Sequence, residues 1–168
     1  MKIWTLGLLF AALFVPAGNA SDSLLSFNGG IGVDPVSGIS AGAPVANVVR
    51  KVGPGGVPWR IAQLTASIEV SGRISVRGRG LLLAGGDGIG TNGAQSVHAI
   101  LFCGPAATAT MHATPAAGVA LAANGDFRID DVLSPAPPNP CTTPVLLIAN
   151  PAPRWFAAGI LANDDDED

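Results

Sequence analysis

Side chains that commonly carry catalysis are scarce in this chain. It has two histidines, His98 and His112, and both lie far in sequence from most of its acidic residues. A copper–zinc site of the superoxide dismutase kind needs more histidines than these two. Nucleophilic catalysis needs a serine held against a base that a third group orients. We therefore predict a non-catalytic protein and keep, as the alternative, a small secreted hydrolase whose site is assembled from loops.

One glycine-rich loop has the letters of a cofactor motif. Residues 88–93 match G-x-G-x-x-G, but a dinucleotide site also needs a following helix and an acid about 20 residues further on. The next segment, 97–103, has the composition of a strand, so we predict a surface loop and no cofactor. Asp87 and Asn92 could offer oxygens to calcium, which takes about six to eight. They are weak candidates for a calcium-binding adhesion-type module, and no other metal site is predicted.

Two tryptophans and three arginines are the candidate binding residues. Trp59 and Trp155 could form a platform on which a sugar stacks, or they could be core residues; a chain without tyrosine offers few other aromatic rings for such a platform. Arg73, Arg77 and Arg79 alternate with other residues along one segment, so they share one face of a strand. That face is either solvated or binds an acidic partner. The predicted partner is a protein or a glycan.

The charge distribution does not suggest a nucleic-acid partner. The chain has 9 basic and 12 acidic residues, and its net charge is -3. Nucleic-acid binding would need clustered basic residues. Five acidic residues end the chain at 164–168. Like charges repel and nothing apolar accompanies them, so we predict a disordered acidic tail over 163–168.

The first twenty residues have the pattern of a secretory signal peptide. Lys2 precedes an apolar run over 3–15, and small residues lead up to Ala20. The run is too short to span a membrane stably. Cleavage near Ala20 would release a secreted or periplasmic protein with no membrane span. Residues 21–162 are then predicted to form one domain.

The two cysteines are predicted to form one disulfide. An exported protein with an even number of cysteines usually pairs them. A bond between Cys103 and Cys141 would close a loop of about 39 residues, which is worth roughly 4 kcal/mol on the chain-entropy model. Neither cysteine has the close second cysteine of a zinc site.

Residues 60–79 contain the clearest structural pattern in the chain. Apolar and polar residues alternate strictly in two runs separated by Ser71-Gly72, which predicts an antiparallel hairpin with one buried face. A three-residue loop over 70–72, with Gly72 at positive φ, keeps the apolar residues of both strands on one face. The pairs it predicts are Ile68 with Ile74 and Glu69 with Arg73.

The rest of the chain also has the pattern of short strands. By the same argument, residues 119–133 predict a second hairpin around Asn124-Gly125, with Leu121 opposite Phe127. No sustained helical period occurs, so the predicted fold is all-β: a two-sheet antiparallel sandwich, Greek-key and immunoglobulin-like in plan, with eight or nine strands. The further strands are expected at 24–33, 45–52, 97–103, 145–149 and 155–161.

Three segments resemble a group of small secreted bacterial proteins for which no function is known. They are Gly78-Arg79-Gly80-Leu81-Leu82-Leu83-Ala84-Gly85-Gly86 with Ile89-Gly90-Thr91, Asn124-Gly125-Asp126-Phe127-Arg128-Ile129-Asp130-Asp131 with Leu133-Ser134-Pro135, and Trp155-Phe156-Ala157-Ala158-Gly159-Ile160. The resemblance implies a small exported β protein and assigns no site residue. The function expected on all these grounds is that of a binding or structural module of the cell envelope or the extracellular space.

Overall fold

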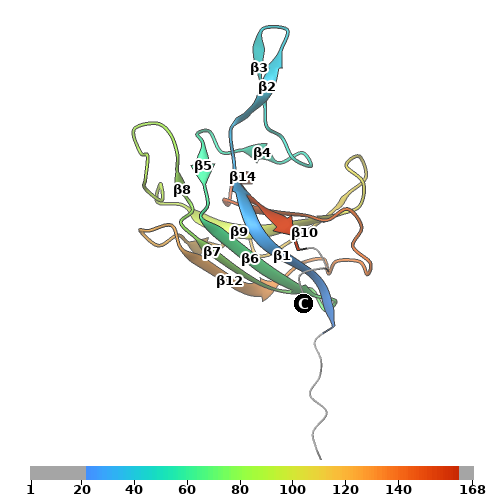
Figure 1. The fold of residues 1–168 in the computed structure, drawn as a ribbon. Helices are drawn as coiled ribbons and strands as arrows, with labels where there is room; N and C mark the ends of the chain where they lie inside the picture. The colour runs from blue at the N-terminus through green and yellow to red at the C-terminus, as the bar shows by residue number, and fades with distance from the viewer. Residues whose placement is uncertain (1–21, 163–168) are drawn as a thin grey trace, which may run out of the picture.

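The computed structural model describes residues 22–162, and every regular element in that part of the chain is a β-strand (Figure 1). The predicted signal peptide and acidic tail lie outside the described residues. The strands are β1 (Ser23–Gly32), β2 (Val36–Ser40), β3 (Ala43–Ala46), β4 (Gly53–Pro54), β5 (Trp59–Arg60), β6 (Gln63–Glu69), β7 (Arg73–Arg79), β8 (Leu82–Leu83), β9 (Ser96–Cys103), β10 (Thr110–Ala113), β11 (Val119–Ala120), β12 (Phe127–Val132), β13 (Val145–Ala149) and β14 (Arg154–Leu161).

The β6–β7 hairpin has the predicted register. Ile68 lies opposite Ile74, and Gly72 adopts a φ of 86° in the three-residue loop. The side chains of Glu69 and Arg73 approach to 3.9 Å across the turn. The apolar residues of both strands are buried and their neighbours are exposed or half-buried, so the alternation was enough to predict pairing, loop and face.

One continuous sheet replaces the predicted two-sheet sandwich. Its strand order is β10-β9-β13-β14-β1-β6-β7-β12, nearly all antiparallel, with β4 parallel to β14. The two ends of this order approach each other, because Ala113 of β10 forms a bridge with Ser134, just after β12. The sheet therefore curls into a nearly closed, barrel-like form. The immunoglobulin-like plan was wrong in this respect because β1 pairs with both β14 and β6, which joins what would otherwise be two sheets.

The number of strands also exceeds the prediction, because residues 22–162 contain 14 in place of eight or nine. The additional ones are the two-residue strands β4, β5 and β8, the short strand β10 and the short pair β2–β3, mostly in segments predicted to be loops. Segments this short have no measurable periodicity, so the sequence could not indicate them. The predicted strand over 45–52 was wrong: β3 ends at Ala46, and the chain then turns.

The second predicted hairpin is wrong in its pairing. A tight turn does occur, with Gly125 at a φ of 80° and the Ala122 N–H donating to the Asp126 carbonyl. Beyond it the two arms separate: β11 pairs with β9, whereas β12 pairs with β7. The edge of β12 therefore pairs with β7, and the local alternation could not distinguish these two partners.

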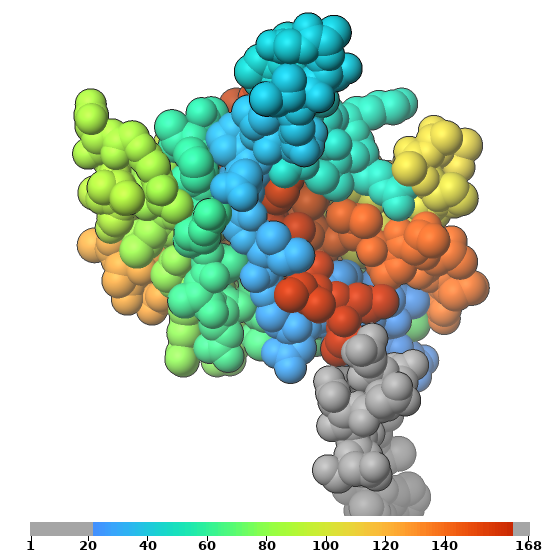
Figure 2. All heavy atoms as spheres, turned by 45° about the horizontal axis from the view of Figure 1, so that its top comes forward, coloured from blue at the N-terminus to red at the C-terminus, as the bar shows by residue number. Residues whose placement is uncertain are grey.

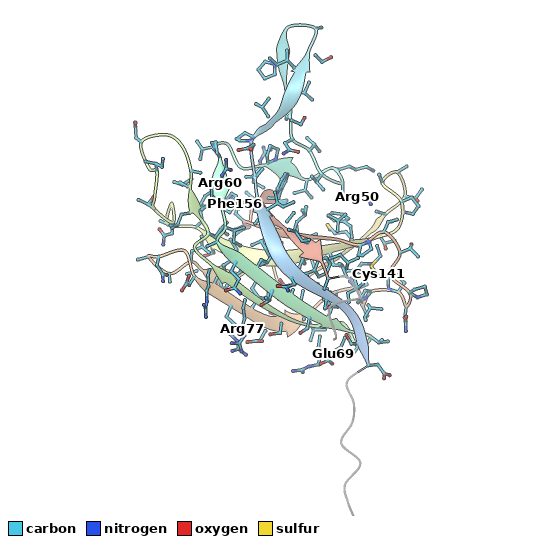
Figure 3. The ribbon with its side chains drawn as sticks, in the orientation of Figure 1. Arg50, Arg60, Glu69, Arg77, Cys141 and Phe156 are labelled. Carbon is cyan, nitrogen blue, oxygen red and sulfur yellow. A yellow bond between two sulfur atoms is a disulfide. The ribbon has the colours of Figure 1, made fainter. Side chains whose placement is uncertain are left out.

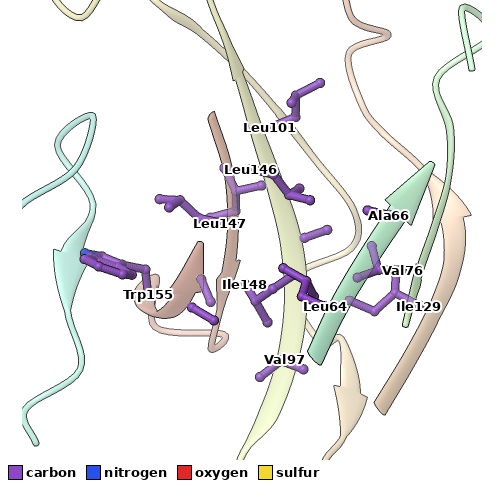
Figure 4. Close-up of a cluster of buried hydrophobic side chains, with 14 of the residues drawn as sticks. Leu64, Ala66, Val76, Val97, Leu101, Ile129, Leu146, Leu147, Ile148 and Trp155 are labelled. Atoms are coloured by element: carbon purple, nitrogen blue, oxygen red, sulfur yellow. The ribbon is translucent and has the colours of Figure 1, made fainter. Parts of the chain in front are cut away.

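The interior of the curled sheet holds the main core (Figure 4). Side chains from strands far apart in sequence meet there, and the largest are wholly buried. They include Leu64, Val76, Val97, Leu101, Ile129, Leu146 and Ile148. Burial of a side chain of this size contributes roughly 1.5–3 kcal/mol.

A second apolar layer lies on the outside of the same sheet. Strands β9 and β13 are buried on both faces, as the continuous apolar run in 97–103 predicted. The Trp155 ring packs in this layer, where its indole N–H donates to the carbonyl of Asn47 at 2.9 Å. The segment between β3 and β5 thus covers the outer face of the sheet beside β14.

The predicted disulfide is present. Cys103 at the end of β9 bonds to Cys141 in the proline-rich segment before β13, with Cα atoms 5.0 Å apart. Both cysteines are buried. The bond ties the irregular crossing over 133–144 to the sheet, and residues 22–162 contain no other cysteine.

Candidate functional site

Strands β2 and β3 form an arm that projects from the body of the protein (Figure 1). We use "the arm" for residues 36–46. Every residue of both strands is exposed, and Ile39 reaches 77%. In Figure 2 its cyan spheres stand out from the surface at the top of the view. A two-stranded hairpin alone in water is at best marginally stable, so an arm of this kind needs a surface to cover it.

The two strands of the arm are joined by an unusual two-residue turn. Ser40 pairs with Ala43, and the two turn residues, Ala41 and Gly42, have φ values of 49° and 78°. Positive φ at both positions is the geometry whose twist matches paired strands. Asparagine or aspartate normally occupies the first of them, and alanine gives no such signal. For that reason the sequence predicted only a connection over 34–44 and no hairpin.

The base of the arm is anchored to the body. Asn47 donates its backbone N–H to Pro35 O and its side-chain amide to Asp34 O, at 2.9 and 3.0 Å. The carbonyl of the same Asn47 accepts the bond from Trp155. Asp34 also forms an ion pair with Arg60 at 3.1 Å. The root of the arm is thus fixed by a buried indole and by β5, while the arm itself projects.

The surface of the arm is apolar and uncharged. No charged residue occurs between Asp34 and Arg50. The large apolar side chains exposed here are Val36, Ile39, Val45 and, just after the arm, Val48. Ile39 pairs with Pro44 and Val45 with Gly38, so these two side chains point to opposite faces and both faces of the arm carry exposed apolar groups. Exposed apolar surface is typical of an interaction site.

Only one edge of the arm can donate a full set of backbone hydrogen bonds. Pro44 on β3 pairs with Ile39, and a proline has no N–H to donate. Next to the turn-closing pair, ladder geometry turns the backbone groups of Ile39 and Pro44 outward. The outer edge of β3 is therefore blunted, whereas β2 has no proline and keeps every N–H, although a bulge between Val36 and Gly38 interrupts their regular spacing.

The predicted arginine face lies on the outside of the sheet, on β7. Arg77 pairs with Thr65 of β6 and with Arg128 of β12, and Arg79 pairs with Gln63. Neither Arg77 nor Arg79 forms an ion pair with a residue in the described part of the chain. Figure 3 shows Arg77 on the outer side of the sheet, well away from Phe156.

Acidic residues share this face with the arginines. A hollow of about 340 Å³ is lined by Glu69, Arg73, Asp130 and Asp131 among others. The hydrogen bond from Arg128, and then that from Ser75 at 2.7 Å, hold the pKa of Asp130 below its usual range. Mixed charge of this kind neutralises itself locally, so the face lacks the single sign that a polyanion site needs.

The two tryptophans do not form an open stacking platform. Trp155 is 4% exposed and lies on the sheet's covered outer face, with its N–H bonded to Asn47. Trp59 is 3% exposed and stacks on Phe156 with ring centroids 4.2 Å apart. Their burial corresponds to the core interpretation that the sequence left open, and it contradicts an exposed pair.

Neither histidine has the surroundings of a catalytic base. His112 is buried and contacts the Thr110 hydroxyl and the Pro135 carbonyl, both at 2.9 Å. His98 is buried with neither ring nitrogen bonded to a described residue. Burial lowers the pKa of His98, and backbone groups of Thr114 and Asn150 oppose the shift only in part. Neither ring meets a serine or an acid, which the hydrolase alternative requires.

One serine has the letters of a nucleophile elbow, although no such motif was predicted. Gly38-Ile39-Ser40-Ala41-Gly42 matches G-x-S-x-G. An elbow requires a strand, a sharp turn and then a helix, with a histidine close by. Ser40 instead ends β2 at the tip of the arm, next to a strand-to-strand turn and far from either buried histidine. The match is therefore fortuitous.

The glycine-rich loop does not assemble a metal site. Asn92 uses its amide to bind the carbonyls of Leu121 and Ala122, and its side-chain oxygen accepts from Ala94 N–H. Its donors and its acceptor thus serve to fasten the loop beside β11. Asp87 forms no hydrogen bond with Asn92, and residues 22–162 contain no group of three or more histidines, cysteines or acids placed to hold a metal ion. The next element after residues 88–93 is strand β9 and not a helix, so the loop also lacks the dinucleotide geometry.

Comparison with known proteins assigns neither a family nor a function to the chain. The chain matches no protein-family model, and neither the search of curated proteins nor that of solved structures found a match. The resemblance to a group of secreted bacterial proteins therefore stays a prediction. Within residues 22–162, no helix is long and apolar enough to cross a membrane.

Proposed function

We propose that this protein is an exported, non-catalytic binding module that engages a protein partner of the cell envelope or the extracellular space through its arm. The observation that carries the proposal is the exposure of an uncharged, apolar hairpin on a firmly anchored base. A glycan is commonly recognised by stacking on open aromatic rings, and the arm contains no aromatic residue. A protein surface with a free strand edge or an apolar groove is the chemistry that fits it.

Export is supported by two independent features. The first twenty residues have the pattern of a signal peptide. The buried disulfide between Cys103 and Cys141 is the kind of bond that persists in oxidising compartments. Both the periplasm and the extracellular space provide such conditions, and we propose one of these two locations.

The anchored base explains how the arm would act. Hydrogen bonds from Asn47 and the ion pair of Asp34 hold the root before any partner arrives, so less conformational entropy is lost on binding. The edge of β2 from Gly38 to Ser40, beyond the bulge, would then pair with a partner strand, while Val36 and Ile39 enter apolar pockets. Main-chain pairing supplies affinity in such strand addition, and the alternate side chains supply specificity.

Site-specific photo-crosslinking in the cells that naturally export the protein tests this function. A benzophenone amino acid replaces Ile39 in one variant and, as a matched control, Ile89 in another. Both isoleucines are strongly exposed, and Ile89 lies in the loop before β9. We expect illumination to give one discrete, identifiable protein adduct from position 39 and none from position 89.

Two further outcomes decide the matter. An adduct that forms equally at both positions, or none at position 39, would show that the arm is not the contact surface. Replacing Val36 and Val45 by serine in the position-39 variant should remove the adduct, while far-ultraviolet circular dichroism and the melting temperature stay unchanged. Val45 pairs with Gly38 and therefore lies on the face opposite Ile39, so this change removes apolar side chains from both faces of the arm. If the adduct survives it, the apolar side chains of the arm do not carry the interaction.

A further inference from the structure

A pocket lies over the stacked pair of Trp59 and Phe156, on a part of the surface separate from the arm. A β-bulge creates the pair: Ala157 lies opposite Ile148 and Trp155 opposite Ala149, so Phe156 has no partner on β13. The bulge turns the Phe156 ring onto the indole, with an interplanar angle of 14°. Bulges commonly re-aim a side chain in this way next to a functional site.

Glycines give access to the indole from two sides. A Cβ placed on Gly55 would lie 3.1 Å from Trp59 Nε1, and one on Gly93 would lie 3.4 Å from the far end of the same indole. Both glycines line the pocket. Because a glycine has no side chain, the indole ring is accessible from the pocket at both places. The pocket measures about 390 Å³, within the range of small-molecule sites.

The side chains around this pocket have unused hydrogen-bond donors, whereas the acceptors of its two amides are already bonded. Gln95 Oε1 accepts from Asn150 Nδ2, and Asn150 Oδ1 accepts from the Arg154 N–H, so both amide oxygens are occupied. The Trp59 indole N–H and the Arg154 guanidinium make no hydrogen bond with any residue in the described part of the chain. The second N–H of each amide is also unused.

Trp59 is only 3% exposed, but its unpaired indole nitrogen reaches solvent, because the fully buried side-chain atoms without a partner belong to Arg50 and His98. Its partner must be water or a ligand that accepts hydrogen bonds. The guanidinium of Arg154 at the rim adds a positive charge, and no acidic residue lines this pocket. The rest of the wall includes Val57 and Leu83, which are apolar.

We propose that this pocket binds a small organic carboxylate, whose oxygens accept from the Trp59 indole N–H and the Arg154 guanidinium while its hydrocarbon part lies on Leu83 and Val57. The two amides of Gln95 and Asn150 offer further donors to the same carboxylate. A cation would meet the like charge of Arg154 and the unused donors. A neutral amide would lose the charge-assisted bond to arginine, which is about twice as strong as a neutral one.

The indole N–H resonances of the exported chain provide the test. The signal peptide contains Trp4, so the mature protein should show two indole signals, from Trp59 and Trp155, which tryptophan-to-phenylalanine variants assign. The probes are hexanoate, its neutral analogue hexanamide, its cationic analogue hexylamine, and acetate. We expect hexanoate to shift the Trp59 signal saturably and to leave that of Trp155, which is already bonded to Asn47, in place.

Matched variants separate the site from general charge attraction. Arg154→Gln should weaken hexanoate binding by about tenfold or more, as expected for a lost hydrogen bond to a charged group. Arg77→Gln removes the same charge from the far face and should leave binding unchanged. Trp59→Phe keeps the stacked ring, loses the N–H and should weaken binding several-fold, as read from the backbone amide signals of the pocket because this variant lacks the indole signal. Acetate should bind more weakly than hexanoate, because it cannot cover the apolar wall.

Several results would overturn the proposal. One is the absence of any saturable shift with hexanoate; another is a shift of Trp155 and not Trp59. Equal affinity for hexanoate and hexanamide would show that the pocket does not recognise the charge of a carboxylate. Equal weakening by Arg154→Gln and Arg77→Gln, with both variants still folded by the dispersion of their amide spectra, would show nonspecific electrostatic attraction only.

Discussion

The two hairpins of this protein, β6–β7 and the arm β2–β3, share a plan and differ in what covers them. Both are antiparallel, and both turns contain a glycine at positive φ. In β6–β7, every second residue is buried in the core. In the arm no residue of either strand is buried. The comparison shows that backbone pairing alone defines a hairpin's geometry, whereas stability has to come from a covered face.

The composition of the two hairpins agrees with this difference. Strands β6 and β7 contain isoleucine, leucine and valine at alternate positions and arginine, serine or threonine between them. The arm consists of small residues, Pro44 and three large aliphatic side chains. A partner that covers the arm would give it the buried face that the core gives to β6–β7.

The largest difference is expected from truncating one aliphatic side chain in each hairpin. Leu64 is fully buried, so Leu64→Ala should lower the free energy of unfolding by about 3 kcal/mol through lost burial and the cavity left behind. Ile39→Ala in the arm should change it by less than about 0.5 kcal/mol. Urea denaturation measures both. A loss of similar size for the two variants would show that the arm packs on its own body, contrary to the comparison.

A smaller, pH-dependent effect is expected from the layer that holds the arm's base. His98 and Trp155 both pair with Ala149, so they share the covered outer face of the sheet. Burial lowers the pKa of His98 from 6.5, so the unfolded chain binds its proton more readily than the folded protein does. Stability is therefore complete above the unfolded pKa and falls as the pH drops below about 6.5, by at most about 1.4 kcal/mol per pH unit.

His98→Leu should remove that part of the acid sensitivity. Unfolding free energies at several pH values between about 5 and 8 measure it against the parent chain. The matched control His112→Gln should retain the acid-side loss that His98 causes. If the parent and His98→Leu lose stability in parallel, the histidine is not the group responsible.

The smallest effect is expected from the two turn glycines. Gly72→Ala forces a side chain into positive φ, about 3.3 Å from Leu133 O, and should cost about 1–2 kcal/mol of global stability. Gly42→Ala imposes the same backbone strain where nothing lies within 4 Å. It should leave the global unfolding transition in place and increase amide exchange only in the arm. Nuclear magnetic resonance exchange rates, read beside the melting curves, distinguish these outcomes; a global loss from Gly42→Ala would mean that the two hairpins unfold together.

Segments with a buried face could be predicted from the sequence better than exposed segments and loops. The register of β6–β7, the doubly covered β9 and the bulge of β1 at Gly29-Gly30 could all be predicted from periodicity or glycine placement. The candidate sites could not. The arm's turn carries Ala41 in place of a recognisable turn residue, and the pocket depends on a bulge that stacks Phe156 on Trp59 across about a hundred residues of sequence.

The sequence alone determined that this protein is all-β, that β6 and β7 form a hairpin with a known loop and buried face, and that Cys103 and Cys141 pair. The strand content and the hairpin depend on alternation and turn chemistry, which are local properties of the chain. The disulfide follows from the presence of only two cysteines. Only the tertiary structure decided that β1 joins β14 to β6 in one curled sheet, and that β12 pairs with β7 and not with β11. An apolar face specifies that it must be covered, but the hydrophobic effect is non-directional, so it does not specify by which strand.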